Sequence, residues 1–144
     1  MLPLVPYPLK VTPKKATLTF TSVYPSKSNQ LLPNLDLWLS SLGLPQGEGK
    51  DSLKMEFIYE TLEETPTLSS SYSYELDFVD ECLLIIAPSS FGILHGLVTF
   101  AQLYHASPAC KTKPTCKEMS QVYLRDKPAF PWRGLELDVS RHFF

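Results

Sequence analysis

Residues 128–144 have the sequence PAFPWRGLELDVSRHFF, and this stretch decides how the rest of the chain is interpreted. A proline-bracketed aromatic turn opens it, and the following residues alternate as a β-strand does. The apolar face of that strand consists of Leu135, Leu137 and Val139. Polar side chains gather at its end, namely Asp138, Arg141 and His142. Such a strand suits the start of a β/α barrel, where functional sites lie at the C-terminal ends of the strands.

The same stretch resembles a known family. Phe130-Pro131-Trp132, followed by Arg-Gly-Leu-x-Leu-Asp-x-Ser-Arg-His-Phe, resembles the first strand of the catalytic barrel in family 20 glycoside hydrolases, the β-N-acetylhexosaminidases. Leu4–Pro8 is similar to the Pro-aromatic-Pro opening of these enzymes. Residues 82–103, CLLIIAPSSFGILHGLVTFAQL, resemble the strand and helix that close their N-terminal domain. The resemblance covers most of the chain, and residues 25–75 follow it in pattern alone.

The resemblance implies a reaction for the parent protein. Family 20 enzymes hydrolyse terminal, non-reducing N-acetylglucosamine or N-acetylgalactosamine residues, with the substrate's own acetamide as nucleophile and with retention. An adjacent Asp-Glu pair on a later barrel strand protonates the leaving oxygen and orients the acetamide. The acidic neighbours in this chain, Glu63-Glu64 and Asp80-Glu81, are predicted to lie outside any pocket. We therefore expect this chain by itself to be inactive, as an incomplete piece of an enzyme that acts on N-acetylhexosamine-terminated glycans.

Four residues of this stretch are candidates for a role at the site, and for Arg141 the role follows from the resemblance. Arg141 occupies the place of an arginine that binds sugar hydroxyls, a task that suits the planar, two-pronged guanidinium. The alternative is a surface arginine without a ligand. Asp138 either supports the site from behind or is a buried carboxylate paired with an arginine. Arg133 and His142 are expected to be structural, with Arg133 connecting the barrel to the preceding domain.

Length and charge limit the classes of function. The 144 residues suffice for one domain with a hydrophobic core. A formal net charge of −2 gives no reason to expect nucleic acid or an anionic membrane as a partner. The longest apolar run, residues 82–87, is too short to span a membrane. Residues 1–6 lack the features of a signal peptide, although the resemblance implies a lysosomal or secreted protein.

Hydrophobic periodicity predicts an α+β fold for residues 1–127. Alternating apolar residues predict strands over 16–23, 53–60, 72–76, 82–87 and 119–125, with one buried face of the second formed by Met55, Phe57 and Tyr59. The tight turn Phe78–Glu81 predicts that the strands on either side of it pair antiparallel. Helical spacing predicts helices over 29–42 and 91–105, the second with Ser90 as its N-cap. The predicted buried stripe of the first is Leu31, Leu35, Trp38, Leu39 and Leu42, and that of the second is Phe91, Leu94, Leu97, Val98, Ala101 and Tyr104. This order favours a mostly antiparallel sheet with two helices packed on one face, which the resemblance identifies as the zincin-like N-terminal domain of hexosaminidases. Residues 128–144 are then the start of an incomplete (β/α)8 barrel.

The three cysteines predict one bridge and no metal site. Cys110 and Cys116 flank a five-residue loop that a disulfide closes if the protein matures in an oxidising compartment. Cys82 lies in the apolar run and is expected to be a reduced core thiol. The Cys-x5-Cys spacing with only distant histidines does not match a zinc site. No cofactor is expected either.

A stand-alone binding or scaffolding domain is the alternative hypothesis. In that case the strand over residues 133–144 is an interaction edge. Without barrel neighbours its backbone groups lack partners and its apolar side chains face water. Under either hypothesis this strand, without those neighbours, can stay mobile, fold back on the sandwich or pair with a second copy of the chain. Its alternation favours pairing, as a symmetric homodimer or as aggregation. A reading frame that continues into a barrel with an Asp-Glu pair would distinguish the enzyme from this alternative.

Overall fold

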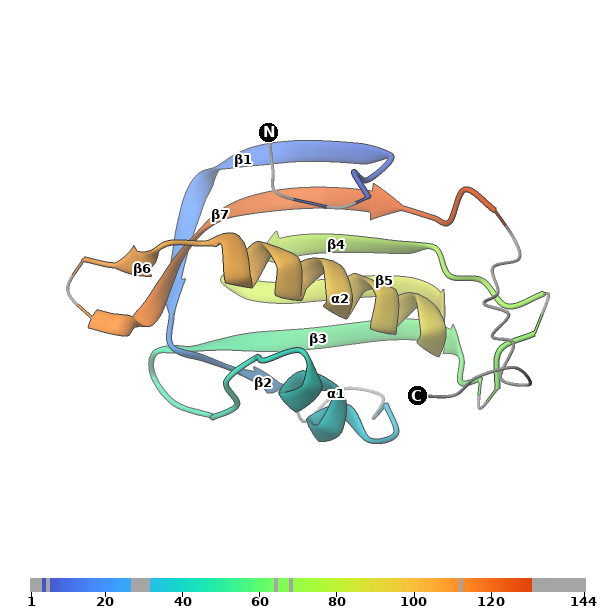
Figure 1. Ribbon diagram of the computed structural model, residues 1–144, viewed down its shortest axis with the longest axis horizontal. Coiled ribbons are helices and arrows are strands. Elements are labelled where there is room, and N and C mark those ends of the chain that lie inside the picture. The colour runs from blue at the N-terminus through green and yellow to red at the C-terminus, as the bar shows by residue number, and fades with distance from the viewer. Residues whose placement is uncertain are drawn as a thin grey trace, which may run out of the picture.

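The structure is a computed structural model, and it describes residues 4, 6–26, 32–63, 65–67, 69–111 and 113–130. It confirms an α+β fold, in which one open, seven-stranded sheet carries two helices (Figure 1). The elements are β1 (Lys10–Phe20), β2 (Ser22–Pro25), α1 (Leu35–Ser41), β3 (Ser52–Thr61), β4 (Tyr74–Val79), β5 (Cys82–Ser89), α2 (Ser90–Ala106), β6 (Ala109–Cys110) and β7 (Lys113–Asp126). The expected barrel strand over residues 133–144 and its pairing in a homodimer fall outside the described residues.

The sheet is mixed: four of the six strand pairings in the described chain are antiparallel, in line with the predicted mostly antiparallel sheet, and two are parallel. Its strand order is β1-β7-β4-β5-β3-β2, with β6 beside β7. β4 and β5 form the predicted antiparallel hairpin, and the turn residues Asp80 and Glu81 have positive φ angles of 48° and 61°. β3 instead pairs in parallel with both β5 and β2, and Phe57 lies opposite Ile85. Pairing between segments this far apart in the chain leaves no local pattern in the sequence.

The strand predicted over residues 16–23 is in fact the end of β1 followed by β2. β1 begins at Lys10 and includes Pro13, which an edge strand tolerates. Its register shifts between Pro13 and Thr17. Thr21 separates the two strands, since its N–H and its Oγ1 donate to the carbonyl of Asp51 at 2.8 Å and 3.2 Å. The chain thus passes from one edge of the sheet to the other around its end (Figure 1).

Two glycines bring α2 very close to the sheet. A Cβ atom on Gly92 would lie 2.4 Å from the carbonyl oxygen of Ser73 and 2.6 Å from the Cβ of Ala87. A Cβ atom on Gly96 would lie 2.6 Å from Cγ2 of Ile85. Real Cβ atoms do not approach other atoms this closely, so both positions require glycine at this helix–sheet separation.

The start of α2 and one residue of its predicted buried side differ from the prediction. The N-cap is Ser89, one residue before Ser90, because its Oγ accepts a hydrogen bond from the N–H of Gly92 at 3.3 Å. Val98, expected to face the sheet, is 42% exposed. The side chains that do face the core and are fully buried include Ile93, Leu97 and Phe100. Gly92 and Gly96 fix how α2 is rotated about its axis, because the side of the helix closest to the sheet has no room for bulky side chains at these positions.

Helix α1 is shorter than predicted and lies beside α2. It begins after Asn34, and its Leu35 and Leu39 are buried as expected, but Trp38 is 43% exposed. The ring of His105 at the end of α2 bonds through Nε2 to the carbonyl of Leu42 at 2.7 Å. The two helices therefore meet on the same side of the sheet (Figure 1). Neither helix of the described chain has the length and apolarity needed to cross a bilayer.

Candidate functional site

The residues to which the sequence assigned a site lie outside the described part of the chain. They are Arg133, Asp138, Arg141 and His142. The described chain leads toward them through β7, which ends at Asp126, and continues to Phe130. Their roles therefore stay predictions, and the structure shows only the end of β7 that precedes this segment.

Aromatic side chains surround the end of β7. Oδ1 of Asp126 accepts a hydrogen bond from the N–H of Leu9 at 3.2 Å, which connects the N-terminal arm to the end of the strand. A pocket of about 350 Å³ lies here, and the residues around it include Tyr7, Tyr72, His95, Val98 and Phe130. The N-terminal arm, α2 and the beginning of the 128–144 segment thus meet at one place.

A buried polar pair forms part of this pocket's wall. The hydroxyl of Tyr74 and Oγ1 of Thr99 are 2.5 Å apart, and they link β4 to α2. Burial raises the pKa of Tyr74 to about 12, because the charged phenolate loses its hydration there. Tyr74 therefore stays protonated near neutral pH, and its hydroxyl serves to hold α2 on the sheet.

The face of the sheet opposite the helices carries paired charges. Glu75 accepts a hydrogen bond from the hydroxyl of Tyr123 at 2.9 Å and lies 3.6 Å from Nε of Arg125. The hydrogen bond to Glu75 raises the pKa of Tyr123. A pocket of about 510 Å³ borders these charges, with Ile58 and Ile86 among its apolar residues. Glu75 is thus partnered by both Tyr123 and Arg125.

Glu63, which the sequence predicted to lie outside any pocket, does line one. Asp80 and Glu81 form an exposed turn, as predicted. Glu63, however, lines a pocket between α1 and α2. The parallel pairing of β3 with β5 places the end of β3 beside the start of α2, a position that the local sequence pattern does not predict. Among the described residues, no three His, Cys, Asp or Glu side chains are grouped to hold a metal ion.

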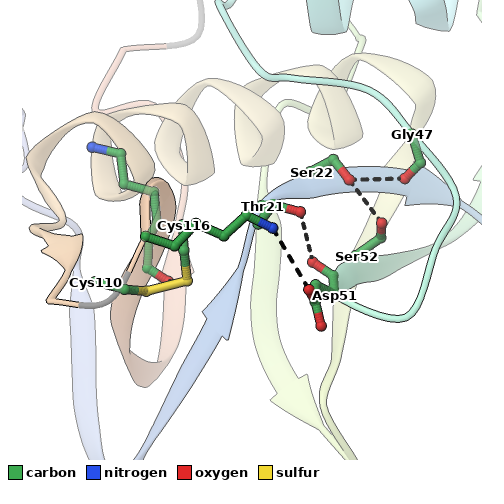
Figure 2. A network of polar contacts seen from close by, with 9 residues as sticks. Thr21, Ser22, Gly47, Asp51, Ser52, Cys110 and Cys116 are labelled. Atoms are coloured by element: carbon green, nitrogen blue, oxygen red, sulfur yellow. Dashed lines mark hydrogen bonds and ion pairs between the residues drawn. A yellow bond between two sulfur atoms is a disulfide. The ribbon is translucent and has the colours of Figure 1, made fainter.

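Cys110 and Cys116 are joined by a disulfide in the structure, and the bridge closes the hairpin between β6 and β7 (Figure 2). Nζ of Lys113 in this hairpin lies 3.8 Å from Oδ2 of Asp51, whose carbonyl binds Thr21. The bridge therefore steadies the end of the sheet around which the chain passes from β1 to β2. Cys82 is a free thiol and is only half buried, contrary to the prediction of a core position. This partial burial raises the pKa of Cys82.

Replacing both bridged cysteines by serine should lower the free energy of unfolding by about 2 kcal/mol. The two cysteines are six positions apart, and so short a loop restricts the unfolded chain only modestly. Urea unfolding of the oxidised protein and of the double variant measures this loss. Cys82→Ser is the control and should change the stability less. Equal stability of the double variant and the oxidised protein would show that the bridge contributes nothing.

Comparisons with known proteins find partial similarity to β-hexosaminidases. No family model matches the chain. It is 35% identical over 94 residues to β-hexosaminidase subunit alpha of Bos taurus, and 38% identical over 82 residues to β-hexosaminidase subunit beta of Mus musculus. The chain is a partial homologue of the family 20 β-hexosaminidases. The matches cover 65% and 56% of this chain, but they span only 17% and 14% of those relatives.

Solved structures of family 20 match nearly the whole chain. The chitobiase of Flavobacterium johnsoniae superposes with a TM-score of 0.69 and 27% identity, over 99% of this chain and 23% of that one. The exo-β-N-acetylglucosaminidase of Vibrio harveyi, solved in complex with N-acetylglucosamine, gives a TM-score of 0.67 at 24% identity, over 99% of this chain and 21% of that one. The matching part is the N-terminal region of the family 20 enzymes. The resemblance drawn from residues 130–143 is thereby confirmed at the level of the family.

Proposed function

We propose that this chain is the N-terminal part of a β-N-acetylhexosaminidase. Residues 1–127 form its non-catalytic, zincin-like domain, and residues 128–144 begin its (β/α)8 barrel. The observation that carries this proposal is the sequence similarity to the β-hexosaminidase subunits. The likeness in fold to the Flavobacterium johnsoniae chitobiase supports it over the full length of the chain.

In this proposal the parent enzyme releases terminal, non-reducing N-acetylglucosamine or N-acetylgalactosamine from glycans. The acetamide of the substrate attacks its own anomeric carbon, and a separate carboxylic acid protonates the leaving oxygen. Arg141 donates two hydrogen bonds in fixed directions to hydroxyls of the terminal sugar. Asp138 holds the polar groups around it in orientation. As in the family that the chain resembles, the Asp-Glu pair for the chemistry belongs to a later barrel strand, and Asp80 and Glu81 form an exposed turn.

The described domain acts as a support in this scheme. The pairing of β7 with β1 and β4 fixes the end from which residues 128–144 depart. The bond from the N–H of Leu9 to Asp126 fixes the same point from the other side. A lysosomal or secreted location fits the disulfide between Cys110 and Cys116, because such bridges persist in oxidising compartments.

The purified chain alone should not hydrolyse a chromogenic β-N-acetylglucosaminide, because one barrel strand cannot supply both the sugar site and the acid. The assay compares the chain with its Arg141→Ala variant at equal concentrations, after circular dichroism shows that both are folded. Turnover that disappears in the variant would contradict the prediction. Turnover that is equal in both and stays with the chain through further purification would contradict it as well.

A further inference from the structure

The pocket of about 510 Å³ on the face of the sheet opposite the helices lies over one row of residues that crosses five strands. The strand register places the members of this row side by side, in the order Lys10, Arg125, Glu75, Ile86 and Ile58. All five line the pocket. Because neighbouring strands lie about 4.8 Å apart, the row is roughly 19 Å long. The pocket is therefore elongated across the strands, a shape that suits a chain-like ligand.

The half of the row on β5 and β3 is apolar and open to solvent. Ile58 is 53% exposed and Ile86 is 40% exposed, and the exposed Pro88 lines the pocket with them. Outward residues of neighbouring strands stand side by side, so the two isoleucines form a continuous apolar platform. A ligand can reach this platform directly, and apolar surface that covers it gains free energy by leaving water.

The rest of the lining carries charges of both signs in equal number. Among the described residues that line the pocket, the cations are Lys10, Arg125 and Lys127 and the anions are Glu60, Glu75 and Asp126. Glu75 already has the partners given above, and Nζ of Lys10 lies 5.5 Å from the centre of the Tyr123 ring. A ligand with a net charge would therefore meet a like charge for each opposite one. A hydroxyl group both donates and accepts, so a neutral ligand rich in hydroxyls can bond to the carboxylates and to the cations at once.

We propose that this pocket binds a neutral oligosaccharide. The C–H faces of its sugar rings lie on Ile58 and Ile86, and its hydroxyl groups donate to Glu75 and accept from Lys10. An oligosaccharide combines the three required properties, which are an extended shape, apolar ring faces and many uncharged hydroxyl groups. The pocket is separate from the sugar site proposed around Arg141, and it would serve in the same way in a chain without glycosidase activity.

The test is a titration of the isotope-labelled full chain with chitotetraose and with cellotetraose, both neutral, followed by NMR of the backbone amides. For at least one of them we expect saturable shifts at the pocket residues of β3, β4 and β5, with a Kd on the order of 1 mM. Ile86→Asp puts a charge on the apolar platform and should weaken binding by about tenfold or more. Val79→Asp is the matched control and should leave binding unchanged, because Val79 is 43% exposed on β4 but lies outside the lining. Ile86→Thr, which keeps the preference for a strand, should weaken binding by about threefold and replaces Ile86→Asp if that variant does not fold.

Three outcomes would overturn the inference. The first is the absence of saturable shifts on these strands with both tetrasaccharides. The second is equal binding by the Ile86 variants and by Val79→Asp. The third is tighter binding of a charged ligand, tested with tetragalacturonate, with the glucosamine tetramer and with triglycine, which would assign the pocket to an ion or a zwitterion. None of these outcomes bears on turnover, so the proposed function is tested separately.

Discussion

Phe100→Ala should lower the free energy of unfolding by about 3–5 kcal/mol, which approaches the whole stability of a small domain. Phe100 is fully buried, and its ring stacks on that of Phe20 with 6.3 Å between centroids. It thus joins the middle of α2 to the end of β1. Removal of the ring leaves a cavity that the neighbouring glycine contacts cannot close, since α2 already touches the sheet at Gly92 and Gly96.

Urea unfolding followed by far-ultraviolet circular dichroism measures this loss. Val98→Ala is the matched control, because Val98 lies on the same helix but is 42% exposed. We expect it to change the free energy of unfolding by at most about 0.5 kcal/mol. Similar losses in the two variants would mean that the side of α2 that carries Phe100 is not the one packed on the sheet.

Local patterns predicted the elements of this fold better than their packing. The alternation of Met55, Phe57 and Tyr59 predicted β3 and its buried face, and the structure confirms both. The predicted buried side of α2 is confirmed at Leu97, Ala101 and Tyr104 and was wrong at Val98, which is exposed. Gly92 and Gly96 mark the side that approaches the sheet most closely. The parallel pairing of β3 with β5 was missed, since a pairing across an intervening strand is set by the whole sheet.

The candidate site shows the same difference between what local sequence predicts and what packing decides. Arg141 could be assigned because a long, ordered motif carries it, independently of any geometry. Glu63 could not be found from the sequence, because its pocket exists only once the parallel pairing places the end of β3 beside α2. Trp38 was assigned to the buried stripe of α1 by its spacing, yet it is 43% exposed because this short helix lies at the edge of the layer.

Arg141→Lys should lower kcat/KM of an active enzyme that contains this chain by roughly tenfold to a hundredfold. Lysine keeps the charge but loses the planar fork, so one directed hydrogen bond to the sugar is lost. Such an enzyme can be made by replacing the matching N-terminal region of the Flavobacterium johnsoniae chitobiase with residues 1–144, since 99% of this chain superposes on it. Arg125→Lys is the matched control, because this exposed arginine pairs with Glu75 on the sheet surface.

The most direct measurement is kcat/KM of this grafted chitobiase for chitobiose, beside the host enzyme and a host that lacks the replaced region. If the chain is the N-terminal part of a β-N-acetylhexosaminidase, the graft should be active within about tenfold of the host. It should also lose activity on Arg141→Lys and keep it on Arg125→Lys. A graft that folds but releases no N-acetylglucosamine would contradict the proposal and favour a stand-alone binding domain. Equal activity of the two arginine variants would contradict the role of Arg141.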